Sequence, residues 1–150
     1  MSSLLVTGGA GFIGTNFVRY WVKKNPDDSI IVLDALTYAA CLDNLAPVSD
    51  SDKYRFVEGD ICDRALLDQV LGDHRPEAVM HLAAESHVDR SINGPGAFIE
   101  TNINGTYENE KLPLGEKDNQ IIVCIFSTVY INLQLNDIEY SKQRVILLYL

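Results

Sequence analysis

Short runs of apolar or alternating residues, typical of buried strands, recur along the chain. They lie at residues 4–6, 30–33, 54–57, 78–82 and 121–126. After the first run, apolar side chains recur at Ile13, Phe17 and Trp21, which is the period of an amphipathic helix. Five strands that alternate with helical crossovers predict an α/β fold with a doubly wound parallel sheet.

Turn-forming residues predict where the helices begin and end. Asn25-Pro26 is expected to end the first helix, because proline cannot continue the hydrogen-bond ladder. Asp63 is typical of the N-cap of a second helix, and Gly72 of its end. A third helical pattern opens at Gly94-Pro95 and is broken at Pro113, so it is long enough to cross the sheet.

Three glycines, Gly8, Gly11 and Gly14, follow the first strand directly. Gly8 permits a tight turn, Gly11 leaves room for a pyrophosphate, and Gly14 lets the helix pack closely on the strand it has just left. The N–H groups at the start of that helix favour an anion. An ordinary strand-to-helix turn is the alternative interpretation of these glycines, so their context decides.

That context includes a carboxylate at the end of the second strand. Asp34 stands twenty positions after Gly14, where a carboxylate accepts hydrogen bonds from an adenosine ribose. It would repel a 2′-phosphate, and Ala35 rather than an arginine follows it. Strand, glycines, helix, strand and acid in this order predict a Rossmann-type domain that binds NAD rather than NADP.

Other strand ends supply further candidates for the same site. Asp60 follows the third strand and is placed to accept a hydrogen bond from the adenine amino group. Ala83 and Ala84 follow the fourth strand, and their small side chains let a flat nucleotide lie against the backbone. The run 36–38 after Asp34 has two interpretations. It either lines an adenosine pocket or forms a surface loop with a buried Tyr38.

Length, composition and charge narrow the class of protein. With 150 residues, of which 47% are hydrophobic, the chain is expected to form one domain with a sizeable core. The net charge of −9 would repel nucleic acid and anionic membranes. Cys41, Cys62 and Cys124 predict no disulfide framework. Met1 is followed by no signal-peptide pattern, so we expect a cytoplasmic protein.

A metal site is the other chemistry that nearby residues suggest. His81, Glu85 and His87 lie at a strand end and in the loop after it. Their spacing is not a recurrent zinc pattern, and they occupy the place where the cofactor is expected. We therefore predict no metal.

Four motifs together are specific to one family. They are residues 7–14 (TGGAGFIG), 34–39 (DALTYA), 59–63 (GDICD) and 80–92 (MHLAAESHVDRSI). With them, the first 107 residues closely resemble the bacterial nucleotide-sugar dehydratases of the extended short-chain dehydrogenase/reductase superfamily, in particular the dTDP-glucose 4,6-dehydratases. The reaction implied by this resemblance removes a hydride from sugar C4 to NAD⁺, eliminates water across C5 and C6, and returns the hydride to C6.

The resemblance also implies which residues, beside the glycines, contact NAD. They are Phe12, Ile13, Asp34, Ala35, Leu36, Thr37, Asp60, Ile61, Leu82, Ala83, Ala84, Glu85, Ser86 and Thr101. Ser86 would also touch the nucleotide sugar, which is the small-molecule partner that the resemblance implies.

The chain departs from the family pattern after Tyr107. The family's next strand ends in Ser-Thr-Asp-Glu-Val-Tyr, whereas residues 127–130 here read STVY, without the acidic pair. Thr128 remains as the catalytic candidate, but general acid–base catalysis needs a titratable group, so Thr128 alone cannot carry the elimination. Tyr140 and Arg144 match only the spacing of the family's Tyr-x-x-x-Lys pair.

Residues 108–150 are therefore expected to be a divergent tail of a single dinucleotide-binding domain, with the family's C-terminal substrate domain absent. Residues 129–135 alternate as in a strand, and residues 145–150 are a further apolar run. An exposed strand edge there would favour self-association, which leaves a homodimer open.

Two functions from different classes remain open. The chain is either a dehydratase in a truncated, weakly active or inactive form, or an NAD-binding module that catalyses nothing. An NAD-dependent epimerase or reductase of the same superfamily is a lesser alternative, because residues 85–92 resemble the dehydratases specifically.

Overall fold

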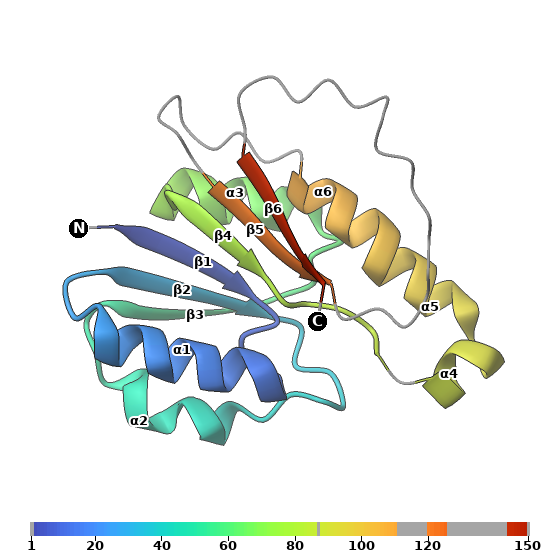
Figure 1. The fold of residues 1–150 in the computed structure, drawn as a ribbon, viewed down its shortest axis with the longest axis horizontal. Coiled ribbons are helices and arrows are strands. Elements are labelled where there is room, and N and C mark those ends of the chain that lie inside the picture. Colours follow the sequence, from blue (N-terminus) through green and yellow to red (C-terminus); the bar gives the residue numbers. More distant parts are fainter. Residues whose placement is uncertain (1, 87, 111–119, 126–143, 150) are drawn as a thin grey trace.

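The computed structural model describes residues 2–86, 88–110, 120–125 and 144–149. Within these residues, six parallel strands form one sheet in the order β3-β2-β1-β4-β5-β6. The strands are β1 (Ser3–Thr7), β2 (Ser29–Asp34), β3 (Tyr54–Glu58), β4 (Ala78–His81), β5 (Gln120–Ile125) and β6 (Arg144–Tyr149). Figure 1 shows this sheet with the helices that connect its strands. The predicted α/β fold is confirmed.

The helices follow the order expected for a doubly wound sheet. They are α1 (Phe12–Lys24), α2 (Ala46–Ser49), α3 (Arg64–His74), α4 (Val88–Asn93), α5 (Pro95–Ile99) and α6 (Thr106–Glu110). A π-helical segment, Glu100–Gly105, joins α5 to α6, and a 3₁₀ turn, Leu42–Leu45, precedes α2. None of the helices in the described ranges is long and apolar enough to cross a membrane.

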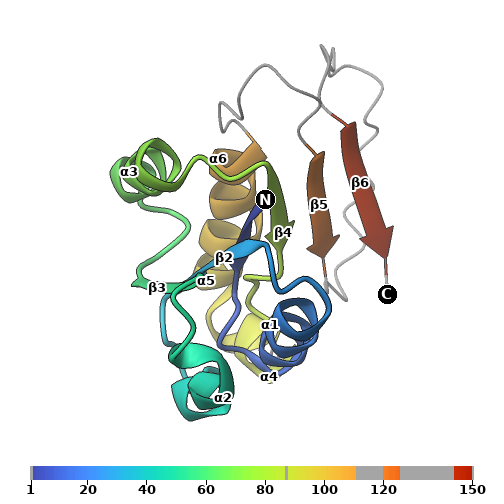
Figure 2. The ribbon, with the colours of Figure 1, turned by 90° about the vertical axis from the view of Figure 1, so that its left-hand side faces the viewer.

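Each face of the sheet has its own hydrophobic core, because successive strand residues point to opposite faces. On one face Leu5 packs with Leu67 of α3, and on the other Val6 packs with Val18 of α1. Figures 1 and 2 show α3 and α6 on one side of the sheet and α1 on the other. The central strands are thus buried on both faces, which explains their nearly continuous apolar sequence.

The predicted start of α3 is confirmed, and its predicted end at Gly72 is wrong. Asp63 is the N-cap, since its Oδ1 accepts a hydrogen bond from the N–H of Leu66 at 3.1 Å. The helix continues through Gly72 and ends at His74, and its C-cap Arg75 has a φ of 45°. Pro76 follows, and a proline disfavours right-handed helical geometry in the residue before it.

The predicted apolar face of α1 also needs a correction at its first turn. Ile13 is 41% exposed, whereas Gly14, Thr15 and Val18 are buried. Gly14 packs against the preceding loop and turns this face of the helix to the sheet, which leaves Ile13 outside. Phe17 and Trp21 do pack against the core, as expected.

The C-terminal part adds a strand that the sequence did not assign. The apolar run at 145–150 provides most of β6, which pairs with β5. The alternating run at 129–135 lies outside the described residues.

Candidate functional site

A pocket opens at the carboxyl ends of β1 to β4. It is lined by Gly8, Gly11, Leu33, Asp34, Ala35, Thr37, Ala39, Ala40, Gly59, Asp60, Ile61, Leu82, Ala83, Ala84, Glu85 and Thr101. Ligands of open α/β sheets bind at this edge, where the strand order reverses on either side of β1. Most of the residues predicted to contact a cofactor are therefore brought together in one place.

The glycine loop lies so close to neighbouring backbone that two of its positions have no room for a side chain. Gly8 has a φ of 69°, and a Cβ on it would lie 2.5 Å from the backbone nitrogen of Ala83. A Cβ on Gly14 would collide with the carbonyl oxygen of Gly8 and lie 2.6 Å from the Cα of Gly9. Gly14 thus allows the helix to approach the loop, whose atoms are the nearest to its Cβ, rather than the strand before it as the sequence predicted.

Helix α1 begins at this loop with its backbone N–H groups uncapped by a side chain. Its N-cap is Gly11, which makes no side-chain capping bond, and its first turn carries no acidic residue. The first N–H groups of a helix lack intrahelical acceptors and, with the helix dipole, favour an anion. The start of α1 is therefore suited to a phosphate group.

Asp34 is held rigidly at the end of β2. It is 8% exposed, its Oδ2 accepts from the N–H of Ala10 at 2.8 Å, and its Oδ1 accepts from the N–H of Leu36 at 2.9 Å. Each carboxylate oxygen can accept a second hydrogen bond. Asp34 can therefore connect the glycine loop to β2 and still accept from a hydroxyl in the pocket.

Leu36 does not line the pocket, although the family resemblance implied contact. Its φ is 50°, and its side chain packs against the core on the α1 face. This left-handed conformation separates Leu36 from its neighbours Ala35 and Thr37, which do line the pocket.

Asp60 lies just after the end of β3. Its Oδ1 accepts from the N–H of Cys62 at 2.9 Å, which closes a local turn. Asp60 and Ile61 both line the pocket. Asp34 and Asp60 thus put two carboxylates at the ends of the adjacent strands β2 and β3.

Other predicted contact residues lie beside the pocket without lining it. Phe12 is 84% exposed, Gly14 is buried against the loop, and Ser86 is exposed. Phe12 and Ile13 can reach an anion only through their backbone N–H groups at the start of α1. The pocket is also lined by four residues that the sequence analysis did not assign, Leu33, Ala39, Ala40 and Gly59. Their position near a strand end or in the loop after β2 could have indicated them.

The interpretation of residues 36–38 as a surface loop with a buried Tyr38 is wrong about the burial of this side chain. It is 50% exposed, and its hydroxyl donates to Oε2 of Glu85 at 3.2 Å. The guanidinium carbon of Arg90 lies 3.9 Å from the centre of its ring. Tyr38 therefore joins the loop after β2 to the loop after β4.

His81 lies in the core, and it belongs to no group of three or more potential metal ligands among the described residues. Its Nδ1 is 2.5 Å from the hydroxyl of Thr7, and its Nε2 is 3.1 Å from the hydroxyl of Thr106. Burial lowers the pKa of His81 to about 4, so the ring is neutral near pH 7. His87 lies outside the described residues.

Cys41 and Cys62 are free thiols. Burial, followed by the hydrogen bond with Asp60 and the charges of Asp60 and Glu100, raises the pKa of Cys62 to about 12. Its thiol also donates to the carbonyl oxygen of Glu100 at 3.4 Å. Cys62 is therefore protonated near neutral pH and is not a nucleophile there.

The catalytic candidates at the C-terminal side are not placed by the structure. Thr128 and Tyr140 lie outside the described residues. Arg144 begins strand β6 and therefore does not share a helix with a tyrosine.

Comparison with known proteins agrees with this geometry. Residues 5–108 match the family model described as GDP-mannose 4,6 dehydratase. The dTDP-glucose 4,6-dehydratase of Shigella flexneri is 60% identical over 104 residues, which are 69% of this chain and 28% of that protein. The low-salt glycan biosynthesis protein Agl12 of Haloferax volcanii is 57% identical over 103 residues, 69% of this chain and 32% of that protein.

Solved structures show the same similarity. DesIV, a dTDP-glucose 4,6-dehydratase of Streptomyces venezuelae solved with NAD bound, aligns with a TM-score of 0.73 and 47% identity over 81% of this chain and 38% of its own. A UDP-glucose 4-epimerase of Thermotoga maritima aligns with a TM-score of 0.69 and 32% identity over 81% of this chain and 37% of its own.

The chain thus spans about three-tenths of the length of the curated relatives that it matches. The matched residues hold the glycine loop, Asp34, Asp60 and the loop after β4. On this match the chain belongs to the dTDP-glucose 4,6-dehydratase family and corresponds to the N-terminal part of its members.

Proposed function

We propose that this chain binds NAD in the pocket at the carboxyl ends of β1 to β4. The pyrophosphate would lie on the N–H groups at the start of α1, the adenosine ribose would donate to Asp34, and the adenine amino group would donate to Asp60. The observation that carries this proposal is the convergence of the glycine loop, Asp34 and Ala83 on one pocket. Structures of relatives solved with NAD support it.

The same geometry favours NAD over NADP. A 2′-phosphate would lie beside the carboxylate of Asp34, which is already fixed by two backbone N–H groups and cannot turn away. The next residue, Ala35, offers no positive charge to offset the repulsion. We therefore expect much weaker binding of NADP⁺.

Calorimetric titration with NAD⁺ and with NADP⁺ tests this proposal. We expect heat of binding for NAD⁺, and loss of that binding in Gly14→Ala, because the added Cβ pushes α1 from the loop. Gly72→Ala is the matched control, since no atom lies within 4 Å of the added Cβ in α3. Absence of heat and of any thermal shift with NAD⁺ would reject the proposal.

Within the family reaction, we infer that this part of the protein binds and orients the cofactor. Bound NAD supplies the temporary acceptor for the hydride that leaves sugar C4. The chain's own residues would hold the dinucleotide on the loop and Asp34, and Ser86 would contact the nucleotide sugar. The acidic pair and the Tyr-x-x-x-Lys pair are missing from residues 108–150, so we expect weak or no dehydration by this chain.

Incubation with NAD⁺ and dTDP-glucose separates the two functional hypotheses. An NAD-binding module that catalyses nothing would bind NAD⁺ and yield no 4-keto-6-deoxy sugar at high protein concentration. Formation of that product would support an active dehydratase instead.

A further inference from the structure

The pocket wall formed by residues 82–86 has no regular secondary structure. Leu82, Ala83 and Ala84 line the pocket, but their side chains cannot form hydrogen bonds, so the position of this wall has to be fixed through its backbone. The tolerance is small, because the backbone nitrogen of Ala83 lies only 2.5 Å from the position that a Cβ on Gly8 would take. A shift of the wall would therefore move it into the glycine loop or open the pocket.

The side-chain amide of Asn102 holds this backbone at Glu85. Its Oδ1 accepts from the N–H of Glu85 at 2.8 Å, and its Nδ2 donates to the carbonyl oxygen of Glu85 at 2.8 Å. An amide carries an acceptor and donors side by side, so it can satisfy both backbone groups of one residue. A carboxylate could accept from the N–H but could not donate to the carbonyl group.

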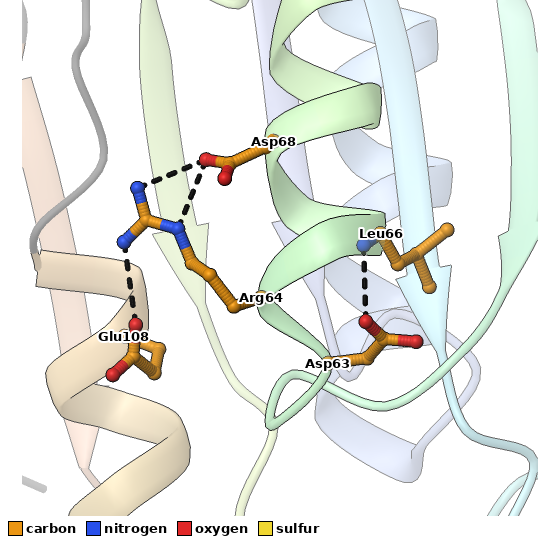
Figure 3. A network of polar contacts seen from close by, with 5 residues as sticks. All are labelled: Asp63, Arg64, Leu66, Asp68 and Glu108. Carbon is orange, nitrogen blue, oxygen red and sulfur yellow. Dashed lines mark hydrogen bonds and ion pairs between the residues drawn. The ribbon is translucent and has the colours of Figure 1, made fainter.

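The segment that carries Asn102 is itself attached to the body of the domain. Asn102 lies in the π-helical segment Glu100–Gly105, next to Thr101 of the pocket. One residue past this segment, the Thr106 hydroxyl lies 3.1 Å from His81 of β4. Arg64 of α3 pairs with Glu108 of α6 at 3.3 Å, as Figure 3 shows. Asn102 is therefore a fixed point against which the loop after β4 can be held.

Glu85 also reaches the opposite wall of the pocket. Its carboxylate accepts from the hydroxyl of Tyr38 in the loop after β2. Because Asn102 holds the backbone of Glu85, the carboxylate of Glu85 stays within reach of Tyr38, and this contact joins the loops after β2 and β4.

We propose that Asn102 is a positioning residue of the cofactor pocket, which acts through the main chain of Glu85 and does not touch the cofactor. The proposal rests on the NAD binding proposed above. It predicts that removal of the Asn102 amide loosens the loop after β4 and weakens NAD binding, while the fold is kept.

The test compares Asn102→Ala with Asn104→Ala in the whole chain. Asn104 lies on the same segment, is exposed, and bonds only Glu100 through its side chain in the described contacts. We expect the Kd for NAD⁺ to rise about tenfold in Asn102→Ala, because two hydrogen bonds that order the wall are lost. The Kd of Asn104→Ala should stay within about twofold of the wild type.

Hydrogen exchange at the Glu85 amide distinguishes the positioning role from a general loss of stability, because a general loss would speed exchange at many amides and not at Glu85 alone. We expect faster exchange at Glu85 in Asn102→Ala and unchanged exchange in Asn104→Ala. Asn102→Asp keeps the acceptor for that N–H but loses the donor to the Glu85 carbonyl group. If Asn102→Ala does not fold, this variant replaces it, and we expect a smaller rise in the Kd for NAD⁺, about threefold; an unchanged Kd would then overturn the positioning role.

The outcomes separate this inference from the proposed function. NAD⁺ binding within twofold of the wild type in Asn102→Ala, or unchanged exchange at Glu85, would overturn the positioning role. If the wild type bound no NAD⁺, the proposed function would be rejected. The role of Asn102 in cofactor binding would then be rejected as well.

Discussion

At the scale of single residues, buried polar groups join the elements beneath the pocket. His81 contacts the hydroxyls of Thr7 on β1 and Thr106 on α6. A neutral imidazole has one donor and one acceptor nitrogen, and a hydroxyl can serve either, so both ring nitrogens are paired in the neutral state that burial favours. Gly8 follows Thr7 and Leu82 follows His81, and these two residues begin the loops after β1 and β4 that line the pocket.

This burial predicts a dependence of stability on pH. The pKa of His81 is about 4 in the folded protein and about 6.5 in the unfolded chain. Below pH 6.5 the unfolded chain binds a proton that the folded protein does not. The free energy of unfolding should therefore fall between about pH 6.5 and 4, by at most about 3 kcal/mol from this group.

Urea unfolding of the wild type and of His81→Gln over this pH range measures the effect. The glutamine cannot titrate, so the difference in unfolding free energy between the two proteins should shrink as the pH falls. Parallel pH profiles would show that His81 does not carry the effect.

At the scale of elements, the helix from α5 to α6 depends on close packing at one glycine. A Cβ on Gly105 would lie 2.7 Å from Cγ1 and Cδ1 of Ile61 and 3.1 Å from the sulfur of Cys62. Ile61 is buried in the core on the α3 face, so it cannot move away freely. Gly105 thus sets the distance between this helix and the end of β3.

Gly105→Ala should destabilise the protein by about 1–3 kcal/mol, because the added methyl group overpacks this contact. Gly96→Ala in α5 is the control: no atom lies within 4 Å of its Cβ, and alanine there should stabilise by about 0.5–1 kcal/mol. Thermal unfolding of both variants measures the difference. Equal effects would contradict the packing argument.

The elements also show which features can be predicted from a sequence of this kind. The glycine loop, Asp34 and the N-cap Asp63 were predictable because their roles depend on neighbours close in the chain or at a fixed spacing. The contact of Asn102 with Glu85 joins residues 17 positions apart, and nothing local in the sequence indicates it. The end of α3 was missed because Pro76, rather than Gly72, stops the helix.

At the scale of the whole molecule, apolar side chains are exposed along the helix from α5 to α6. Ile99, Ile103 and Tyr107 are 53%, 42% and 54% exposed and lie four residues apart. Figure 1 shows this helix near α3, on the side of the sheet away from α1. A second copy of the chain could cover the same surface about a two-fold axis, since such interfaces are self-complementary.

We therefore predict a homodimer that depends on this surface. Size-exclusion chromatography with light scattering should give a dimer for the wild type and a monomer for Ile103→Glu, because a charge would be buried at the interface. Tyr20→Glu on α1, where the tyrosine is 59% exposed, should remain dimeric. A wild type that is monomeric at high concentration would contradict the prediction.

The central claim is that NAD lies on the edge of the sheet where β1 to β4 end. An NMR titration of the ¹⁵N-labelled chain with NAD⁺ tests it most directly, because each backbone amide reports its own surroundings. We predict that the largest shifts come from Gly11, Phe12 and Ile13 at the start of α1, and from Ala35 and Thr37 after β2. Shifts concentrated at the opposite edge of the sheet, around Lys53 and His74, or no shifts at saturating NAD⁺, would contradict it.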